Sequence, residues 1–116
     1  MKNELFDKKI RNEVLVDCKD DYERNMSWFY YLEEQLRFPF IAYIPVKTIE
    51  KTYEKVFKKV NVIGLKEEDF GDKFEMKVET EFDRYIMEFP LAILHDIRAS
   101  ESVVEAIELW QYWVKK

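Results

Sequence analysis

Acidic side chains gather at three places along the chain, and they are the residues best suited to chemistry. The three groups are Asp17, Asp20, Asp21 and Glu23; the pair Glu33 and Glu34; and Glu67, Glu68, Asp69 and Asp72. Calcium takes about six to eight oxygen ligands from carboxylates, carbonyls and water, whereas magnesium uses fewer carboxylates and keeps more water. Each acidic group therefore offers ligands for a hard divalent cation.

The third acidic group is predicted to lie in a loop between two strands, next to Gly64 and Gly71. A loop can turn several carboxylates and carbonyls toward one point, which a regular helix cannot do. The segment from Asp69 to Asp72 is too short for an EF-hand loop and lacks its alternating ligands. A calcium site in this chain would therefore be of a different kind.

Each run of acids also has an ordinary structural explanation. Acids near the start of a helix, such as Asp20, Asp21 and Glu23, cap the helix and interact favourably with its dipole. Regularly spaced acids elsewhere are typical of solvated faces. The strand set is Glu75, Glu79 and Glu81, and the helix set is Glu101, Glu105 and Glu108. Residue type alone therefore does not show whether these acids bind a metal ion or only cap a helix and face solvent.

Other catalytic motifs are largely missing from the sequence. His95 is the only histidine, which excludes most histidine-based zinc sites and weakens any hydrolase triad. Cys18 would need His95 beside it to act as a nucleophile, and a small buried or half-buried thiol is the expected role. The sequence has no phosphate-binding glycine loop and no dinucleotide-binding motif. We therefore expect a protein that is not an enzyme.

The length of the chain predicts one small domain spanning residues 1–116. The 24 acids outnumber the 19 bases, and the net charge of −5 disfavours binding to nucleic acid or to an anionic membrane. The single cysteine cannot form an intrachain disulfide, and no apolar run approaches the roughly 20 residues of a membrane span. These features predict a soluble protein of the reducing cytoplasm.

Two helices are predicted at the start of the chain, among the secondary-structure elements that position the acids. Apolar residues at near-helical spacing predict an amphipathic helix over residues 4–16. Asp20 or Asp21 can cap a second helix that runs to about Arg37 and is stopped by Pro39. The stretch Met26–Phe40 holds a dense aromatic run, and we expect its rings to build the core.

Short strands and a closing helix are predicted to follow. Phe40–Val46 is predicted as a strand, with Pro45 marking an edge, and residues 47–58 fit either a helix or an extended connector. The other predicted strands are Lys59–Gly64, Phe74–Val78, Tyr85–Phe89 and Pro90–Leu94, with a hairpin turn at Glu81–Arg84. Ser102 and Glu105 have capping-box spacing at the start of the last helix. The pattern predicts an α+β fold with a small sheet or barrel.

Several segments resemble the CcbP-type calcium-binding proteins of cyanobacteria. The most specific are the Trp-Phe-Tyr-Tyr-Leu-Glu run that begins at Trp28 and the Trp-Gln-Tyr-Trp-Val-Lys run that begins at Trp110. Glu13–Asp17 and Val62–Leu65 match in the same order, so the resemblance spans nearly all of the chain apart from residues 46–58.

The resemblance implies a small antiparallel Greek-key, SH3-like β-barrel packed with two N-terminal helices and a C-terminal helix. It also implies a role in buffering or sensing Ca²⁺ without EF-hands, through acidic surface clusters. The acids that match by position are Asp17, Glu33, Glu34, Glu67 and Glu68. Asp69, Asp72 and Asp96 match less closely, and the first two complete the predicted set of metal ligands.

The chain departs from the family pattern in its many basic residues. Lys66 and Lys73 flank the third acidic group, and Lys19 lies in the first. A nearby cation competes with calcium for the same carboxylates, so calcium binding should be weakened. The alternative hypothesis is a metal-independent interaction module that grips a partner protein through exposed aromatic side chains on an SH3-like barrel.

Overall fold

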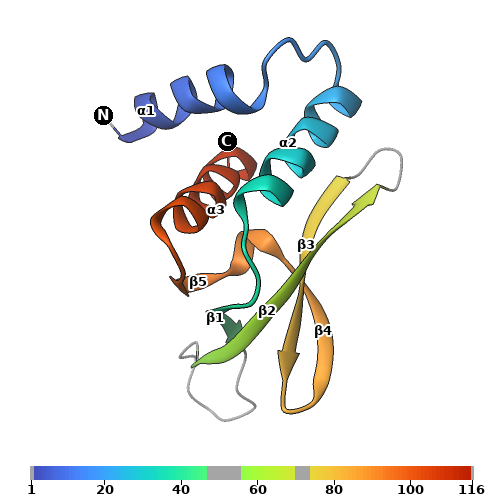
Figure 1. The fold of residues 1–116 in the computed structure, drawn as a ribbon, viewed down its shortest axis with the longest axis vertical. Helices are drawn as coiled ribbons and strands as arrows, with labels where there is room; N and C mark the ends of the chain where they lie inside the picture. Colours follow the sequence, from blue (N-terminus) through green and yellow to red (C-terminus); the bar gives the residue numbers. More distant parts are fainter. Residues whose placement is uncertain (1, 47–55, 70–73, 116) are drawn as a thin grey trace.

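The fold is known from a computed structural model that describes residues 2–46, 56–69 and 74–115. In chain order the helical elements are α1 (Lys2–Lys9), η1 (Ile10–Val14, a π-helical turn), α2 (Asp21–Gln35), η2 (Leu91–Ile93, a 3₁₀ turn) and α3 (Glu101–Val114). The strands are β1 (Phe40–Val46), β2 (Val56–Asp69), β3 (Phe74–Phe82), β4 (Tyr85–Pro90) and β5 (His95–Arg98). Figure 1 shows α2 and α3 side by side, with the long β2–β3 pair running past them.

The five strands form one antiparallel sheet in the order β4-β3-β2-β1-β5. The first four strands follow one another along the sheet, and β5 returns to lie beside β1, as the last strand of a Greek key does. The α+β class is therefore confirmed. The expected closed barrel is not formed among the described residues, because β4 and β5 are edge strands at opposite sides of the sheet.

The core lies where α2 and α3 face the sheet, and it combines many aliphatic side chains with a cluster of aromatic rings. Trp28 is fully buried, and its ring packs edge-on against Trp110 with the centroids 5.2 Å apart. Trp28 also contacts Tyr31 and Trp113. The predicted role of the aromatic run in the core is confirmed for these rings. Tyr30 differs, because it is 60% exposed on the outer side of α2.

Both N-terminal helices are confirmed, with one local difference. The first predicted helix, over residues 4–16, forms as α1 followed by the π-helical turn η1. The second begins after Asp20, whose Oδ1 accepts a hydrogen bond from the backbone N–H of Glu23 at 2.8 Å. Acids near this helix start therefore serve as caps, as the structural explanation predicted.

Strand β1 matches its prediction, although it is an inner strand of the sheet. Pro45 pairs with Phe57 of β2, and the pairing with β5 extends only from Ile41 to Tyr43. Pro45 therefore lies beyond the reach of β5, where its missing N–H is not needed. Of the ambiguous residues 47–58, residues 47–55 lie outside the described ranges and 56–58 belong to β2.

Two predictions for the C-terminal third are wrong. The segment Pro90–Leu94 is not a strand, because Pro90 ends β4 and Leu91–Ile93 form the 3₁₀ turn η2; the next strand is β5. Helix α3 begins after Ser100, so Ser102 and Glu105 do not form a capping box. Glu105 instead accepts a hydrogen bond from Lys9.

Strand β3 and the β3–β4 hairpin agree with the sequence pattern. Asp83 and Arg84 both have positive φ, 50° and 73°, which is the geometry of a two-residue turn whose twist matches the strands. This turn sets the register in which Glu79 lies opposite Glu88. The hairpin therefore decides which carboxylates become neighbours across the sheet.

Candidate metal centre

The first acidic group is occupied mainly with local structure. Asp20 caps α2, and Glu23 accepts a hydrogen bond from the backbone N–H of Lys19 at 2.7 Å. Asp21 pairs with Arg24 at 2.6 Å. Asp17 differs from these acids, because it is exposed and has a φ of 57° in the turn before the helix.

The pair Glu33 and Glu34 is exposed in the last turn of α2. With a rise of about 1.5 Å per residue, this turn lies about 18 Å along the axis from the start of α2. Asp17 precedes that start, so the expected single patch of Asp17, Glu33 and Glu34 is not formed. Glu34 acts instead on Tyr31, whose pKa is raised by burial and further by the charges of Glu13 and Glu34.

The third acidic group lies on a strand, which corrects the predicted loop. Strand β2 continues to Asp69, and Glu67 and Glu68 are successive residues in it. Successive side chains of a strand point to opposite faces. Glu67 lies opposite Met76, on the face that turns toward the core, and Glu68 lies opposite Glu75 on the other face. Asp72 lies outside the described residues.

The strand register places five carboxylates on the side of β2, β3 and β4 that faces away from the core. We call four of them, Glu68, Glu75, Glu79 and Glu88, the outer carboxylate face; the fifth, Glu81, lies nearer the hairpin turn. Gly64, opposite Glu79, leaves room for it, because a Cβ at Gly64 would lie 3.2 Å from the Oε1 atom of Glu79. The acids come from three strands and meet only in the folded sheet.

Two lysines lie within the outer carboxylate face. The Nζ atom of Lys77 is 3.0 Å from Glu68 and 3.7 Å from Glu75. The Nζ atom of Lys66 is 2.9 Å from Glu88. Lys66, which we expect to compete with calcium, therefore pairs with a carboxylate of this face, and so does Lys77, which the sequence analysis did not name.

The ionisation of these groups shows how closely they interact. The hydrogen bond from Lys66 holds the pKa of Glu88 below its usual value, and Lys77 and Glu68 act in the same direction. The pKa of Lys66 is raised, first by its hydrogen bond to Glu88 and further by the charges of Glu68 and Glu79. The pKa of Lys77 is raised, first by its hydrogen bond to Glu68. Each ammonium group is therefore held in a field set by several carboxylates.

The chemistry of these donors fits calcium, although the site is not preassembled. Carboxylate oxygens are the hard ligands that calcium prefers, and water can complete the shell. Within residues 2–46, 56–69 and 74–115, no three Asp, Glu, His or Cys side chains converge closely enough to hold a metal ion. Glu68, Glu75 and Glu88 would have to exchange lysine for calcium and move toward one another.

Sequence reasoning missed Glu88 as a member of this cluster. Its position follows from the turn at Asp83 and Arg84, because a two-residue hairpin turn fixes which residues face each other. Counting back from that turn pairs Glu79 with Glu88. The signal was therefore present in the sequence, but it required the strand pairing rather than a local motif.

The lone cysteine and the lone histidine do not form a catalytic pair. Cys18 lines a pocket with Arg24, whereas His95 lines a different one with Phe57. The Nδ1 atom of His95 lies 2.7 Å from the carbonyl oxygen of Ile93. In the described part of the chain, no helix is both long enough and apolar enough to cross a membrane.

Comparison with known proteins defines the class to which this fold and acidic surface belong. The family profile for the CcbP proteins, described as calcium binding, matches residues 8–114. The chain therefore belongs to the CcbP family of calcium-binding proteins.

Two solved structures of this class are similar over nearly the whole chain. The crystal structure of CcbP from Anabaena has a TM-score of 0.80 and 32% identity, with 97% of this chain and 91% of that chain covered. A calcium-binding protein in its calcium-binding form has a TM-score of 0.75 and 32% identity, covering 97% and 90%. No curated protein sequence matches the chain. Both the predicted family and the predicted fold class are confirmed.

Proposed function

We propose that this chain binds Ca²⁺ reversibly and acts as a calcium buffer or sensor. The observation that carries the proposal is the family match, which spans residues 8–114. The similarity to a protein in its calcium-binding form supports the choice of ion. Oxygen donors without histidine or thiolate in the cluster also favour a hard cation over a transition metal.

We place the main site on the outer carboxylate face and the adjoining end of β2. Glu68, Glu75 and Glu88 would supply carboxylate oxygens. Glu67, Asp69 and Asp72 stay predicted ligands from the sequence. When bound, the ion would neutralise the carboxylates that Lys66 and Lys77 now neutralise. Because a lysine must be displaced first, the affinity should be low and should fall as salt rises.

Asp17 and the pair Glu33 and Glu34 are proposed as separate calcium contacts. They lie at opposite ends of α2 and cannot share one ion. Each would therefore bind calcium weakly, with most of the coordination shell made of water.

Calorimetric titration with CaCl₂, with MgCl₂ as the control, tests this function. We expect heat of binding with calcium and a rise in the melting temperature, because a ligand that binds only the folded state stabilises it. A chain that gives neither heat nor a melting shift at millimolar calcium would overturn the proposal. Glu68→Gln should reduce the heat more than Glu33→Gln, because only Glu68 has carboxylate neighbours from other strands.

A buffer or sensor needs no chemical step, and we propose that the chain is not an enzyme. The separation of Cys18 and His95 into different pockets supports this proposal. The absence of a possible intrachain disulfide supports the cytoplasm as the proposed location, with calcium ions rather than nucleic acid or membrane as partners.

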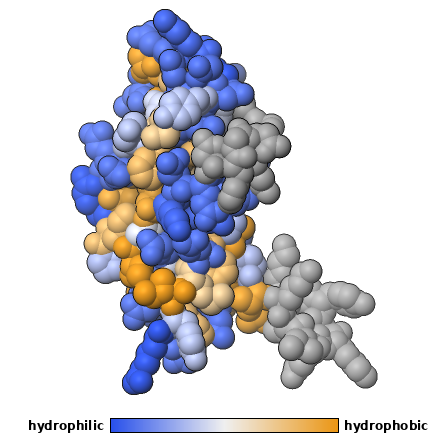
Figure 2. All heavy atoms as spheres, turned by 90° about the vertical axis from the view of Figure 1, so that its right-hand side faces the viewer, coloured by the Kyte–Doolittle hydropathy of each residue, from blue (hydrophilic) through white to orange (hydrophobic). Residues whose placement is uncertain are grey.

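A second candidate function, protein interaction through the β3–β4 hairpin, is favoured by one specific observation. Tyr85, Ile86 and Met87 are 70%, 63% and 50% exposed on the edge strand β4. Figure 2 shows apolar surface gathered toward the lower end of one face, the end at which Figure 1 places this hairpin. A partner captured equally well with and without chelator, and lost in Ile86→Lys, would support this function. Capture that requires calcium would contradict it as a metal-independent role.

A further inference from the structure

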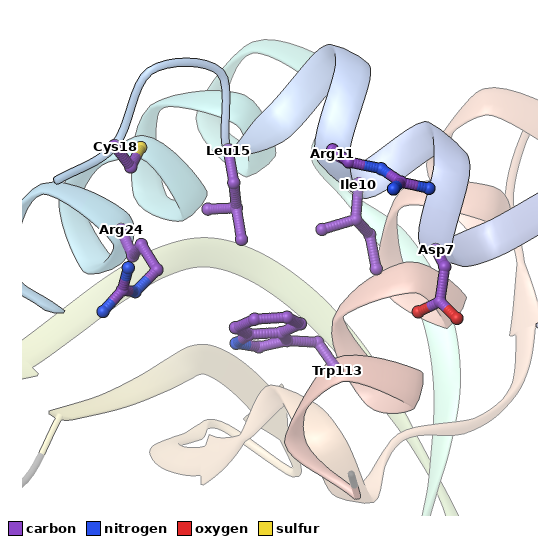
Figure 3. Close-up of a pocket in the computed structure, with 7 residues that line it drawn as sticks. All are labelled: Asp7, Ile10, Arg11, Leu15, Cys18, Arg24 and Trp113. Carbon is purple, nitrogen blue, oxygen red and sulfur yellow. The ribbon is translucent and has the colours of Figure 1, made fainter. Parts of the chain in front are cut away.

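A pocket of about 420 Å³ lies between the N-terminal helical segment and α3, and none of its lining residues belongs to the outer carboxylate face. Figure 3 shows the indole of Trp113 as its floor, with Ile10 and Leu15 pointing toward the ring from the opposite side. Trp113 packs against the buried ring of Trp28, with centroids 6.1 Å apart, so the floor is held in place. The result is a flat apolar slot.

Charged side chains border this slot at both ends. Figure 3 shows Arg24 at one end of the indole and Arg11 with Asp7 at the other. Asp7 accepts a hydrogen bond from the hydroxyl group of Tyr112 at 2.9 Å, and Arg24 pairs with Asp21. Asp21 thus compensates the charge of Arg24, which leaves Arg11 and Asp7 as the other two charged groups of the lining. Arg11 is exposed, and among the described residues no carboxylate forms an ion pair with it.

We propose that this pocket binds a small planar aromatic carboxylate. The ring would lie between the Trp113 indole and the aliphatic side chains of Ile10 and Leu15, where stacking and burial of apolar surface favour a flat molecule. The carboxylate would take the free guanidinium of Arg11, which offers two parallel N–H donors to a planar anion. Pockets of this volume hold molecules of one or two rings.

The pocket should distinguish an anion from its neutral analogue, because Arg11 supplies a cationic donor at one end whereas the slot itself selects only for shape. A charge-assisted hydrogen bond is stronger than a neutral one, so removal of the charge from either side should weaken binding about tenfold. The slot lies on the helical side of the molecule, away from the outer carboxylate face. Calcium held on that face should therefore leave binding to the slot unchanged.

Two-dimensional NMR of the full chain tests this inference with 2-naphthoate as the probe and 2-naphthamide as its neutral analogue. The signal of interest is the indole N–H of Trp113, assigned by comparison with Trp113→Phe. We expect a saturable shift of that signal with naphthoate at a Kd of about 1 mM or lower, and binding about tenfold weaker for the amide.

Arg11→Gln should weaken naphthoate binding about tenfold. Lys8→Gln removes the same charge from a neighbouring exposed position outside the pocket, and it should leave the Kd within about twofold.

Three results would overturn the inference. The first is a naphthoate titration in which the Trp113 signal does not move or does not saturate. The second is equal affinity for the amide, which would show a slot that does not recognise charge. The third is unchanged binding in Arg11→Gln, whose fold can be verified in the same spectra because Arg11 is exposed.

Discussion

The helical side of the molecule and the outer carboxylate face are built on opposite principles. Between α2 and α3, Trp28 and Trp110 are held by burial, and no charge takes part in their contact. On β2, β3 and β4, Glu68 and Glu88 are partly exposed and held against lysines. The first region gains stability from water exclusion, whereas the second keeps charges that an ion can compete for. Substitutions should therefore separate stability from calcium binding.

The largest effect expected is on the helical side. Trp28→Ala should lower the free energy of unfolding by about 3–5 kcal/mol, because it removes a fully buried ring and leaves a cavity. Urea unfolding followed by circular dichroism measures this loss. Tyr22→Ala, at a position 65% exposed, is the matched control and should change stability by about 0.5 kcal/mol or less. Equal losses in the two variants would contradict the assignment of the core.

The next effect distinguishes structural acids from calcium-binding acids. Asp20→Ala should cost about 1 kcal/mol of stability, since it removes the side-chain cap of α2, and should leave the heat of calcium binding unchanged. Asp21→Ala, whose carboxylate is 91% exposed in its ion pair, is the control and should cost less. Loss of calcium binding in Asp20→Ala would show that the first acidic group does more than cap the helix.

A smaller effect tests competition between lysine and calcium. Lys77→Met removes the cation that pairs with Glu68 and Glu75, and it should raise calcium affinity by about three- to fivefold. Lys59→Met, an exposed position on the same strand as Glu68, should leave the affinity unchanged. Calorimetric titration of both variants gives the comparison. Weaker calcium binding in Lys77→Met would mean that the lysine supports the site instead of competing for it.

The smallest effect is a pH dependence that belongs to the outer carboxylate face. The pKa of Glu88 lies below its ordinary value of 4.5 because Lys66 donates a hydrogen bond to the charged form. Its contribution to stability is therefore present above that value and is lost as the pH falls through the lowered pKa. The stability difference between the wild-type chain and Glu88→Gln should be constant near neutral pH and shrink as the solution is acidified below 4.5.

Urea unfolding at several pH values measures this dependence. Leu5→Gln, at a position 68% exposed on α1, is an uncharged control whose stability difference should not follow this profile. A difference between wild type and Glu88→Gln that stays constant through the acid range would contradict the assigned pair.

The two regions also differ in how much of them could be predicted from sequence. The aromatic run and the helical stripe of α3 are local patterns, and they correctly predicted that Trp28 and Trp110 build the core. The α+β class followed from the same kind of pattern. The local capping signal at Ser102 and Glu105 failed because α3 begins two residues earlier, after Ser100.

The outer carboxylate face depends on pairing between strands, which no local pattern contains. Glu67 and Glu68 are adjacent in sequence, but strand alternation sends them to opposite faces. Glu88 is distant from Glu68 in sequence, but the β3–β4 turn brings it into the cluster. A small error in where β2 ends is therefore enough to misplace the site.

The central claim is that calcium is held on the outer carboxylate face, and a backbone NMR titration with calcium tests it most directly. The account predicts saturable shifts at Glu68, Glu75 and Glu88 that exceed those at Glu33 and Glu34, and that are reduced in Glu68→Gln. Magnesium at the same concentration should cause smaller shifts. Saturable shifts confined to α2, or no saturable shift anywhere in the sheet, would contradict the claim.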